Sequence, residues 1–292
     1  MSWRGVTRWV GFGVAAVAAL GTAFTLGVVA GAGSTQPPPA PNPPGLLDDA
    51  ASQISGSSLK PVDVRALDAA AMKAMLGAAG DKWGHWGGEH PALAHDVSTV
   101  MVNPHVGQIV VPGFGQGTGR QVRAAVAVLH RRQVTGIILD LRGNPGGLLS
   151  EAVESASAFL SGGQVVTYSR RDERPQRLDA VGTGDTETDL VVLVDGGTAS
   201  GAEVVAGALQ DRGRAVIVGS RTFGKGSVQE PHRLSDGSSL ALTVARYSLP
   251  SGRSVDGVGI EPDIDVVSPR AMIARALEVL SGLRADTSGG SG

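Results

Sequence analysis

Three glycine-rich segments carry the residues of this chain with the most specific chemistry. They are Asp140–Gly147, Asp195–Glu203 and Gly219–Gln229, with Ser200 in the second segment and Lys225 in the third. A lysine that has lost its proton can deprotonate a serine hydroxyl, which then attacks a carbonyl. Glycine lets backbone N–H groups approach the resulting oxyanion closely. The combination indicates nucleophilic acyl transfer.

Ser200 lies where an expected strand gives way to an expected helix. The dipole at a helix N-terminus favours developing negative charge, and the N–H of Gly201 could donate to an oxyanion. A purely structural alternative remains open, because Ser200-x-x-Glu203 is the pattern of a capping box. The segment is not Gly-x-Ser-x-Gly, so the nucleophile elbow of the α/β-hydrolases is not predicted.

Lys225 stands between two glycines in a chain whose 25 basic residues include only four lysines. Burial would favour its neutral amine, although an exposed loop lysine is the simpler alternative. The segment also nearly matches a phosphate-binding P-loop. Gly226 occupies the position whose hydroxyl should bind Mg²⁺, and residues 227–231 are predicted to be extended rather than helical. His232 has no neighbours typical of a catalytic triad.

The first segment, Asp140–Gly147, follows a predicted buried strand and precedes a predicted helix. Such a glycine-rich loop can hold a phosphate or an oxyanion. The alternative is an ordinary strand-to-helix turn that is rich in glycine and proline.

The surrounding pattern predicts an α/β domain, because short apolar runs alternate with helical periodicity. A mostly parallel sheet covered by helices follows from that alternation, with further β-structure over residues 238–266. The predicted strands cover 108–111, 136–141, 165–168, 190–194 and 215–218, and the predicted helices cover 119–133, 148–160, 200–211 and 272–283.

The N-terminus predicts a membrane anchor over residues 1–33. Arg4 and Arg8 precede an apolar run of about 24 residues, long enough to cross a hydrocarbon core of ~30 Å. This charge distribution keeps the N-terminus in the cytoplasm and places the rest of the chain outside it. A cleaved signal peptide is the alternative, because Ala30-Gly31-Ala32 has the small residues of a cleavage site.

Proline dominates the next segment, which predicts a linker over residues 34–60 in extended polyproline II conformation, or a docking site for a proline-binding module. A helical segment is expected over 61–104, the catalytic domain over 105–284 and a flexible tail over 285–292. His85, His90 and His95 lack metal-ligand spacing and are interpreted as surface or packing residues.

Composition excludes several classes of function. The net charge of −2 includes no basic domain, so no nucleic-acid partner is expected. The chain has no cysteine, which rules out disulfides and thiolate metal sites. The predicted chemistry requires no metal and no organic cofactor.

Five segments together resemble the carboxy-terminal processing proteases, also called tail-specific proteases. The resemblance covers about residues 105–266 and extends weakly to 67–86. Its matching motifs are Asp140–Gly147, Thr198–Glu203, Ala206–Asp211, Thr222–Gln229 and Gly257–Asp263.

The resemblance implies a crotonase-like α/β core with additional β-strands and flanking helices. It implies a Ser-Lys dyad of Ser200 as nucleophile and Lys225 as general base, with Gln229 orienting the lysine. It assigns the oxyanion hole to the N–H groups of Gly146 and Gly201. It implies a serine-type endopeptidase that cleaves protein or peptide substrates near their C-termini.

The chain departs from the family in two ways. Thr198, Gly201 and Ala202 replace small residues of the family motif, which predicts altered flexibility. Residues 87–105 are too few for the peptide-binding PDZ domain that the family carries there, so substrate capture would need a separate partner protein. The alternatives are an inactive binding or scaffold protein with the protease fold, and a crotonase-like acyl-CoA enzyme.

Overall fold

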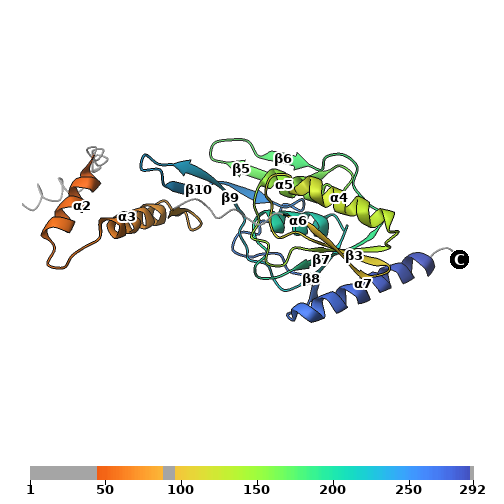
Figure 1. Ribbon diagram of the computed structural model, residues 1–292. Coiled ribbons are helices and arrows are strands. Elements are labelled where there is room, and N and C mark those ends of the chain that lie inside the picture. The colour runs from red at the N-terminus through yellow and green to blue at the C-terminus, as the bar shows by residue number, and fades with distance from the viewer. Residues whose placement is uncertain (1–44, 88–95, 290–292) are drawn as a thin grey trace, which may run out of the picture. The chain divides into compact units, whose positions relative to one another are not determined.

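The computed structural model describes residues 45–87 and 96–289 (Figure 1). The predicted anchor over 1–33, along with His90 and His95, lies outside the described residues. Within the described ranges, no helix combines the length and apolarity that a membrane span requires. The chain divides after Asp68 into two compact units, and each is described by itself.

The first unit contains helix α2 (Leu46–Ser57), and helix α3 (Val64–Ala78) begins within it. Helix α2 lies inside the segment that the sequence predicted as a linker. The prolines end at Pro44, and Asp48 and Asp49 in the first turn stabilise the helix dipole. None of the residues of α2 is buried.

The second unit is built on a six-stranded sheet in the order β11-β8-β7-β4-β3-β2. Strand β2 is antiparallel to β3 and the other neighbouring pairs are parallel, so the expected mostly parallel sheet is confirmed. The strands are β2 (Ser98–Asn103), β3 (Val106–Val110), β4 (Gly136–Asp140), β7 (Asp189–Val194), β8 (Val216–Gly219) and β11 (Ile264–Asp265).

The sheet begins earlier than the sequence predicted. Strand β2 starts at Ser98, before the boundary predicted at residue 105, and pairs with β3 at the sheet edge. Strand β2 contains the apolar residues Val100, Met101 and Val102, but its first half is exposed and Val100 is 52% exposed, so it is not a buried strand.

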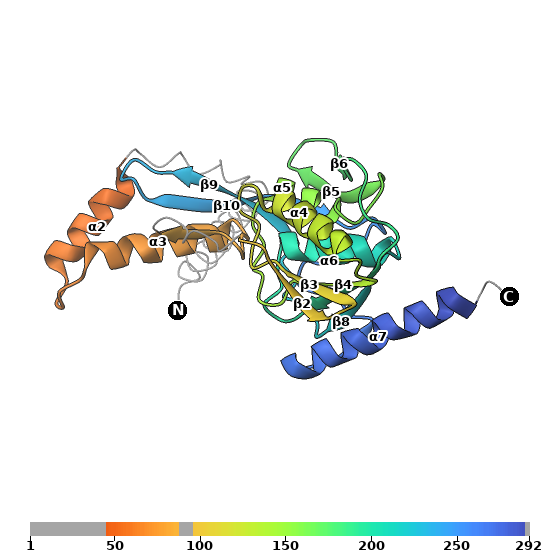
Figure 2. The ribbon, with the colours of Figure 1, turned by 45° about the vertical axis from the view of Figure 1, so that its right-hand side comes forward.

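Helices cover both faces of this sheet (Figures 1 and 2). Strand β7 shows why, because Leu190, Val192 and Val194 join one apolar cluster while Val191 and Leu193 join another. A strand buried on both faces is expected in a parallel sheet. On one face lie α4 (Thr118–Arg131), α5 (Leu149–Ala156) and α6 (Gly201–Asp211), and on the other lies α7 (Pro269–Gly289).

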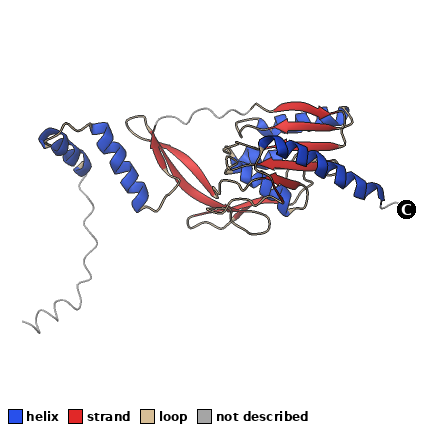
Figure 3. Cartoon of the chain, turned by 90° about the horizontal axis from the view of Figure 1, so that it is seen from below, coloured by secondary structure: helices blue, strands red, loops and turns tan. Residues whose placement is uncertain are grey.

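Helix α7 is longer than predicted, because it begins at Pro269 and continues into the predicted tail. Its residues Met272, Ala276 and Leu280 pack in the second apolar cluster. Helix α5 is shorter than predicted and ends at Ala156. Figure 3 shows α7 running across one side of the strands.

An antiparallel second sheet contains the long hairpin of β9 and β10 (Figure 1). One edge of β10 pairs with β9, and the other pairs with β1 at 239–241 and with β5 at 245–248. Within the described ranges, residues 242–244 therefore have no strand partner on that second edge. The strands are β1 (His85–Gly87), β5 (Gln164–Arg170), β6 (Gln176–Asp179), β9 (Ser227–Arg233) and β10 (Ser239–Ser248).

Candidate active site

The three glycine-rich segments meet at one edge of the main sheet. They follow β4, β7 and β8, which are neighbouring parallel strands, so their carboxyl ends share an edge. The loops are joined directly: the N–H of Ala199 donates to the Asn144 carbonyl at 2.9 Å, and the N–H of Phe223 donates to the Thr198 carbonyl at 3.0 Å. Segments far apart in sequence thus form a single site.

Ser200 adopts a strained backbone conformation, with φ 53° and ψ −118°. Such a conformation costs a non-glycine residue about 1–3 kcal/mol and persists where the surroundings enforce it. Although Gly-x-Ser-x-Gly is absent, Ser200 therefore stands on a sharp strand-to-helix turn that presents its side chain. Gly146 permits this turn, because a Cβ there would lie 2.8 Å from the Cβ of Ser200.

The structure contains the capping-box arrangement that the alternative predicted. By position Ser200 and Glu203 supply both halves of the box, and the N–H of Ser200 donates to the Glu203 carboxylate at 2.9 Å. The N–H of Glu203, however, has its well-formed hydrogen bond with the main-chain carbonyl of Ser200, also at 2.9 Å. The Ser200 side chain faces this N–H without a full hydrogen bond to it, so the cap and a nucleophilic role for the hydroxyl are compatible.

Glu203 has a larger role than the sequence indicated, because it joins the loops that carry Ser200 and Lys225. Its side chain is fully buried. One carboxylate oxygen accepts from the N–H of Ser200 at 2.9 Å and of Lys225 at 2.8 Å. The other accepts from the N–H of Gly224 at 2.8 Å and from the Thr222 hydroxyl at 2.5 Å. Four hydrogen bonds compensate the cost of burying the carboxylate.

Tyr247 supplies a second link between the same two loops. Its hydroxyl lies 2.9 Å from the carbonyl oxygen of Ser200 and 2.8 Å from that of Lys225. Burial raises the pKa of Tyr247 well above its usual value, and the negative charges of Glu203 and Asp256 raise it further. The hydroxyl therefore stays protonated as a donor. No sequence motif marked this residue, since it lies in β10, far along the chain.

Lys225 contacts Gln229 rather than Ser200. Its Nζ donates to the Gln229 Oε1 at 2.6 Å and lies 6.0 Å from the centre of the Trp83 ring. The Gln229 amide donates to the Trp83 carbonyl, which fixes Gln229 with its oxygen toward the lysine. Burial lowers the pKa of Lys225, which favours the neutral amine. Among the described residues, no hydrogen bond joins Lys225 to Ser200.

The backbone amides near Ser200 differ in their availability. The N–H of Gly146 donates to Asn144 Oδ1 at 2.8 Å. The N–H groups of Gly147 and Gly201 have no acceptor within the described part of the chain. A Cβ on Gly201 would lie 3.7 Å from the Gly147 nitrogen, so these two amides are close together. The family resemblance of the sequence had assigned the N–H groups of Gly146 and Gly201 to the oxyanion hole.

Lys225 leads into β9, which begins at Ser227, and not into the helix that a P-loop would open. The prediction of extended chain here is confirmed. Across the described residues, no group of three potential ligands could hold a metal ion.

The comparisons with known proteins agree on one family. A profile described as Peptidase family S41 matches residues 105–266. The carboxy-terminal-processing protease of Bartonella bacilliformis is 42% identical over 174 residues, covering 58% of this chain and 40% of that protein. The carboxyl-terminal-processing protease of Synechocystis is 42% identical over 164 residues, covering 56% and 38%. The chain thus spans about two fifths of these relatives.

A solved structure supports the same likeness. The photosystem II D1 C-terminal processing protease has 34% sequence identity and a TM-score of 0.54, over 61% of this chain and 49% of that chain. The mixed α/β fold is therefore similar to that of a solved protease.

Proposed function

Because the chain belongs to peptidase family S41, we propose that it is a serine endopeptidase with Ser200 as nucleophile and Lys225 as general base. One observation carries the proposal. The buried carboxylate of Glu203 accepts from the backbone N–H groups of both residues, which fixes their loops against each other. The lowered pKa of Lys225 suits a base that must be neutral to act.

The reaction proceeds in two steps. Lys225 takes the proton of Ser200, and the serine oxygen attacks the scissile carbonyl to form a tetrahedral oxyanion. The lysine then returns the proton to the leaving amine as the peptide bond breaks. In the second step Lys225 activates water, which hydrolyses the acyl-enzyme and restores the Ser200 hydroxyl. The Lys225 side chain must rotate toward Ser200, because its amine now contacts Gln229.

Backbone amides stabilise the oxyanion. Gly201 supplies one N–H, and the Gly146–Gly147 turn supplies the second. The N–H of Gly146 must leave Asn144 to serve, whereas that of Gly147 is without an acceptor in the described chain. Such donors are each worth about 3–4 kcal/mol of transition-state stabilisation. No step calls for a metal or an organic cofactor.

The substrates and the location are part of the proposal. Relatives named carboxy-terminal-processing proteases suggest cleavage of protein substrates near their C-termini. The apolar run within residues 1–33 supports a single-pass anchor with the catalytic domain outside the cytoplasm. Residues 79–97 alone separate α3 from β2, which leaves no room there for a peptide-binding domain and favours a separate capture partner.

Digestion of an unstructured reporter protein tests the activity. The purified full chain, in mild detergent, is compared with its Ser200→Ala and Lys225→Ala variants, and mass spectrometry locates the cuts. Only the unmodified chain should cleave. Equal cleavage by all three would assign the activity to a contaminant.

The second candidate is an inactive binding or scaffold protein with the same fold. The observation that favours it is the direction of Lys225, whose amine contacts Gln229 and not Ser200. Catalytic hydrogen bonds are often long or absent in a free enzyme and form only with substrate. The orientation of Lys225 is therefore compatible with the proposed peptidase function. The scaffold function would be favoured if the unmodified chain and both variants are folded but inactive, and if none of them reacts with a serine-directed probe.

A further inference from the structure

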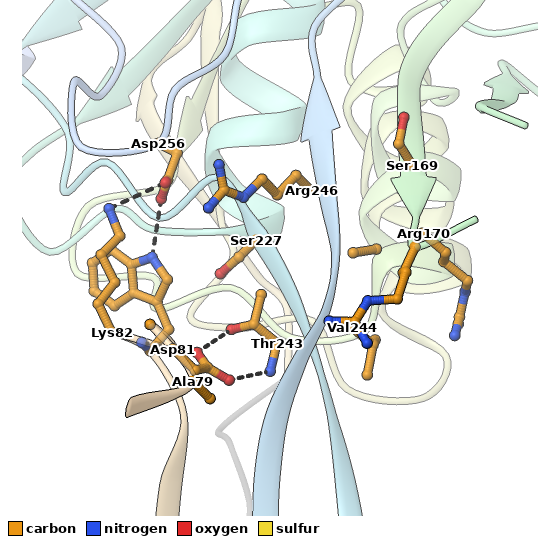
Figure 4. A pocket seen from close by; sticks show the side chains of 14 residues that line it. Ala79, Asp81, Lys82, Ser169, Arg170, Ser227, Thr243, Val244, Arg246 and Asp256 are labelled. Atoms are coloured by element: carbon orange, nitrogen blue, oxygen red, sulfur yellow. Dashed lines mark hydrogen bonds and ion pairs between the residues drawn. The ribbon is translucent and has the colours of Figure 1, made fainter. Parts of the chain in front are cut away.

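A cavity of about 490 Å³ lies beside the catalytic lysine, between residues 79–83 and the antiparallel sheet (Figure 4). Thr243 and Val244 line it, at the part of β10 that has no strand partner on that edge. The cavity thus lies at the part of β10 without a partner among the described strands, and its volume is in the range of ligand-binding pockets.

Trp83 connects this cavity to the dyad, because it lines the cavity while its ring lies 6.0 Å from Lys225 Nζ. The strand register makes a second connection. Ser227 and Gln229 alternate along β9 and share a face of the sheet. Ser227 lines the cavity and Gln229 binds the lysine. A ligand in the cavity would therefore lie next to the proposed catalytic centre.

The charges around the cavity favour an anion. Among the described residues, the cations Arg171 and Arg246 make no ion pair, whereas Lys82 is paired with Asp256 at 3.1 Å. The carboxylate of Asp81 is occupied by the N–H and hydroxyl of Thr243, both at 2.7 Å. The acidic groups are thus partnered, and two guanidinium groups remain available.

Ser227 adds an unused hydrogen-bonding group to the same wall. The residue is 2% exposed, and its hydroxyl has no partner within the described chain. Burying a hydroxyl without a partner is unfavourable, so such groups usually serve a ligand or water. Arg246 lies directly opposite Ser227 in the strand register, and Figure 4 shows the Ser227 side chain between those of Arg246 and Thr243.

We propose that this cavity binds a carboxylate of the polypeptide substrate, with Arg246 as the charge partner and Ser227 as a hydrogen-bond donor. Guanidinium groups bind carboxylates through two parallel hydrogen bonds, which gives both affinity and orientation. The inference rests on the proposed peptidase function and names its substrate subsite. The carboxylate belongs either to the C-terminal residue or to an Asp or Glu side chain.

Binding to the full-length Ser200→Ala variant tests the subsite without requiring turnover. Fluorescence anisotropy is measured with a labelled peptide that ends in a free carboxylate and with the same peptide as a C-terminal amide. The acid should bind about tenfold more tightly, the factor expected for one charged hydrogen-bonded contact. Equal binding of acid and amide peptides would overturn the proposal.

Substitutions in the same background locate the contact. Arg246→Gln should bring the acid-to-amide ratio close to one, and Ser227→Ala should reduce it partly. Arg233→Gln removes a charge from the exposed end of β9, outside the cavity, and should leave the ratio unchanged. Arg246 would not be the charge partner if the acid-to-amide ratio is unchanged in Arg246→Gln, or if the ratio falls equally in Arg233→Gln.

A third peptide separates the two sources of the carboxylate. It carries a C-terminal amide with a penultimate Glu, and binding as tight as that of the free acid would identify side-chain carboxylates as ligands. Weak binding would identify the C-terminal carboxylate. Because these measurements use an inactive variant, failure of the reporter digestion would refute the peptidase while leaving the subsite result to stand by itself.

Discussion

The loops that hold Ser200 and Lys225, and the cavity beside them, use buried polar groups in opposite ways. Around Ser200 and Lys225, the buried side-chain groups of Glu203 and Tyr247 are occupied: Glu203 accepts four hydrogen bonds and the Tyr247 hydroxyl contacts two carbonyls. In the cavity wall, the buried hydroxyl of Ser227 has no partner among the described residues, and Arg246 has no ion pair there.

The difference indicates that the first region is built to be rigid and the second to bind a ligand. Occupied buried groups fix the backbone of Ser200 and Lys225, which would pre-organise the proposed reaction and can sustain the strained turn at Ser200. Unoccupied groups cost free energy in the free protein and recover it when a ligand arrives. Removing a polar group should therefore destabilise the first region and leave the second stable.

The largest effect is expected from Glu203→Ala. It would leave three backbone N–H groups and the Thr222 hydroxyl without their acceptor, lowering the free energy of unfolding by about 4 kcal/mol or more and abolishing cleavage. Urea denaturation measures the change. Glu151→Ala is the control, since that carboxylate is partly exposed, accepts from the N–H groups of Gly117 and Gly119, and should cost less. Equal losses in the free energy of unfolding for Glu203→Ala and Glu151→Ala would contradict the role of Glu203 in joining the two loops.

Tyr247→Phe should have the next largest effect. Loss of its hydroxyl frees the carbonyls of Ser200 and Lys225, which should cost about 1–2 kcal/mol of stability and lower kcat more than KM. Tyr168→Phe is a matched control, because the Tyr168 hydroxyl donates to Gln176 at the surface. A Tyr247→Phe protein with unchanged kcat would show that the bridge does not position the dyad.

The pH profile should respond to Gln229→Glu. Activity requires neutral Lys225, so kcat/KM should rise with pH through a midpoint below the usual lysine value of 10.5, because burial lowers the pKa. A carboxylate at position 229 favours the charged amine and should move the midpoint up by about one unit. The exposed Gln176→Glu change should leave it in place. If Gln229→Glu does not change the midpoint of the pH profile, the titrating group is not Lys225.

The smallest effect is expected from Ser227→Ala. The sign of the change in the free energy of unfolding is the informative quantity. Removing a hydroxyl without a partner should leave the unfolding free energy unchanged or raise it by up to about 1 kcal/mol. The control Ser157→Ala removes a buried hydroxyl that bonds to Val153 and Val181 and should destabilise. Destabilisation by Ser227→Ala as large as that of the control would mean that its hydroxyl already has a structural role.

The sequence predicted the parallel sheet well because its central strands are short apolar runs, such as Gly136–Asp140, that only a doubly covered sheet can bury. It also predicted which three loops would meet. Strand β2 and helix α2 were missed because neither contains a buried residue, so neither has the fully buried apolar run of the central strands.

At the site, the sequence identified groups within its three motifs, and Ser200 and Lys225 do lie on loops that touch. Trp83 was missed because its contact with Gln229 spans 146 residues of chain, and Tyr247 was missed because its contacts with Ser200 and Lys225 lie outside the three motifs. Glu203 was noticed only as a cap, since its bonds to Gly224 and Lys225 depend on the loop after β8.

Acylation of Ser200 tests the central claim most directly. The full chain is mixed with an activated ester, quenched with acid at intervals and digested for mass spectrometry, beside its Lys225→Ala variant at several pH values. The account predicts an acyl group on Ser200 that forms faster as pH rises, with a rate at least about a thousandfold lower without the lysine. Acylation at another residue, or equal rates in the two proteins, would contradict it.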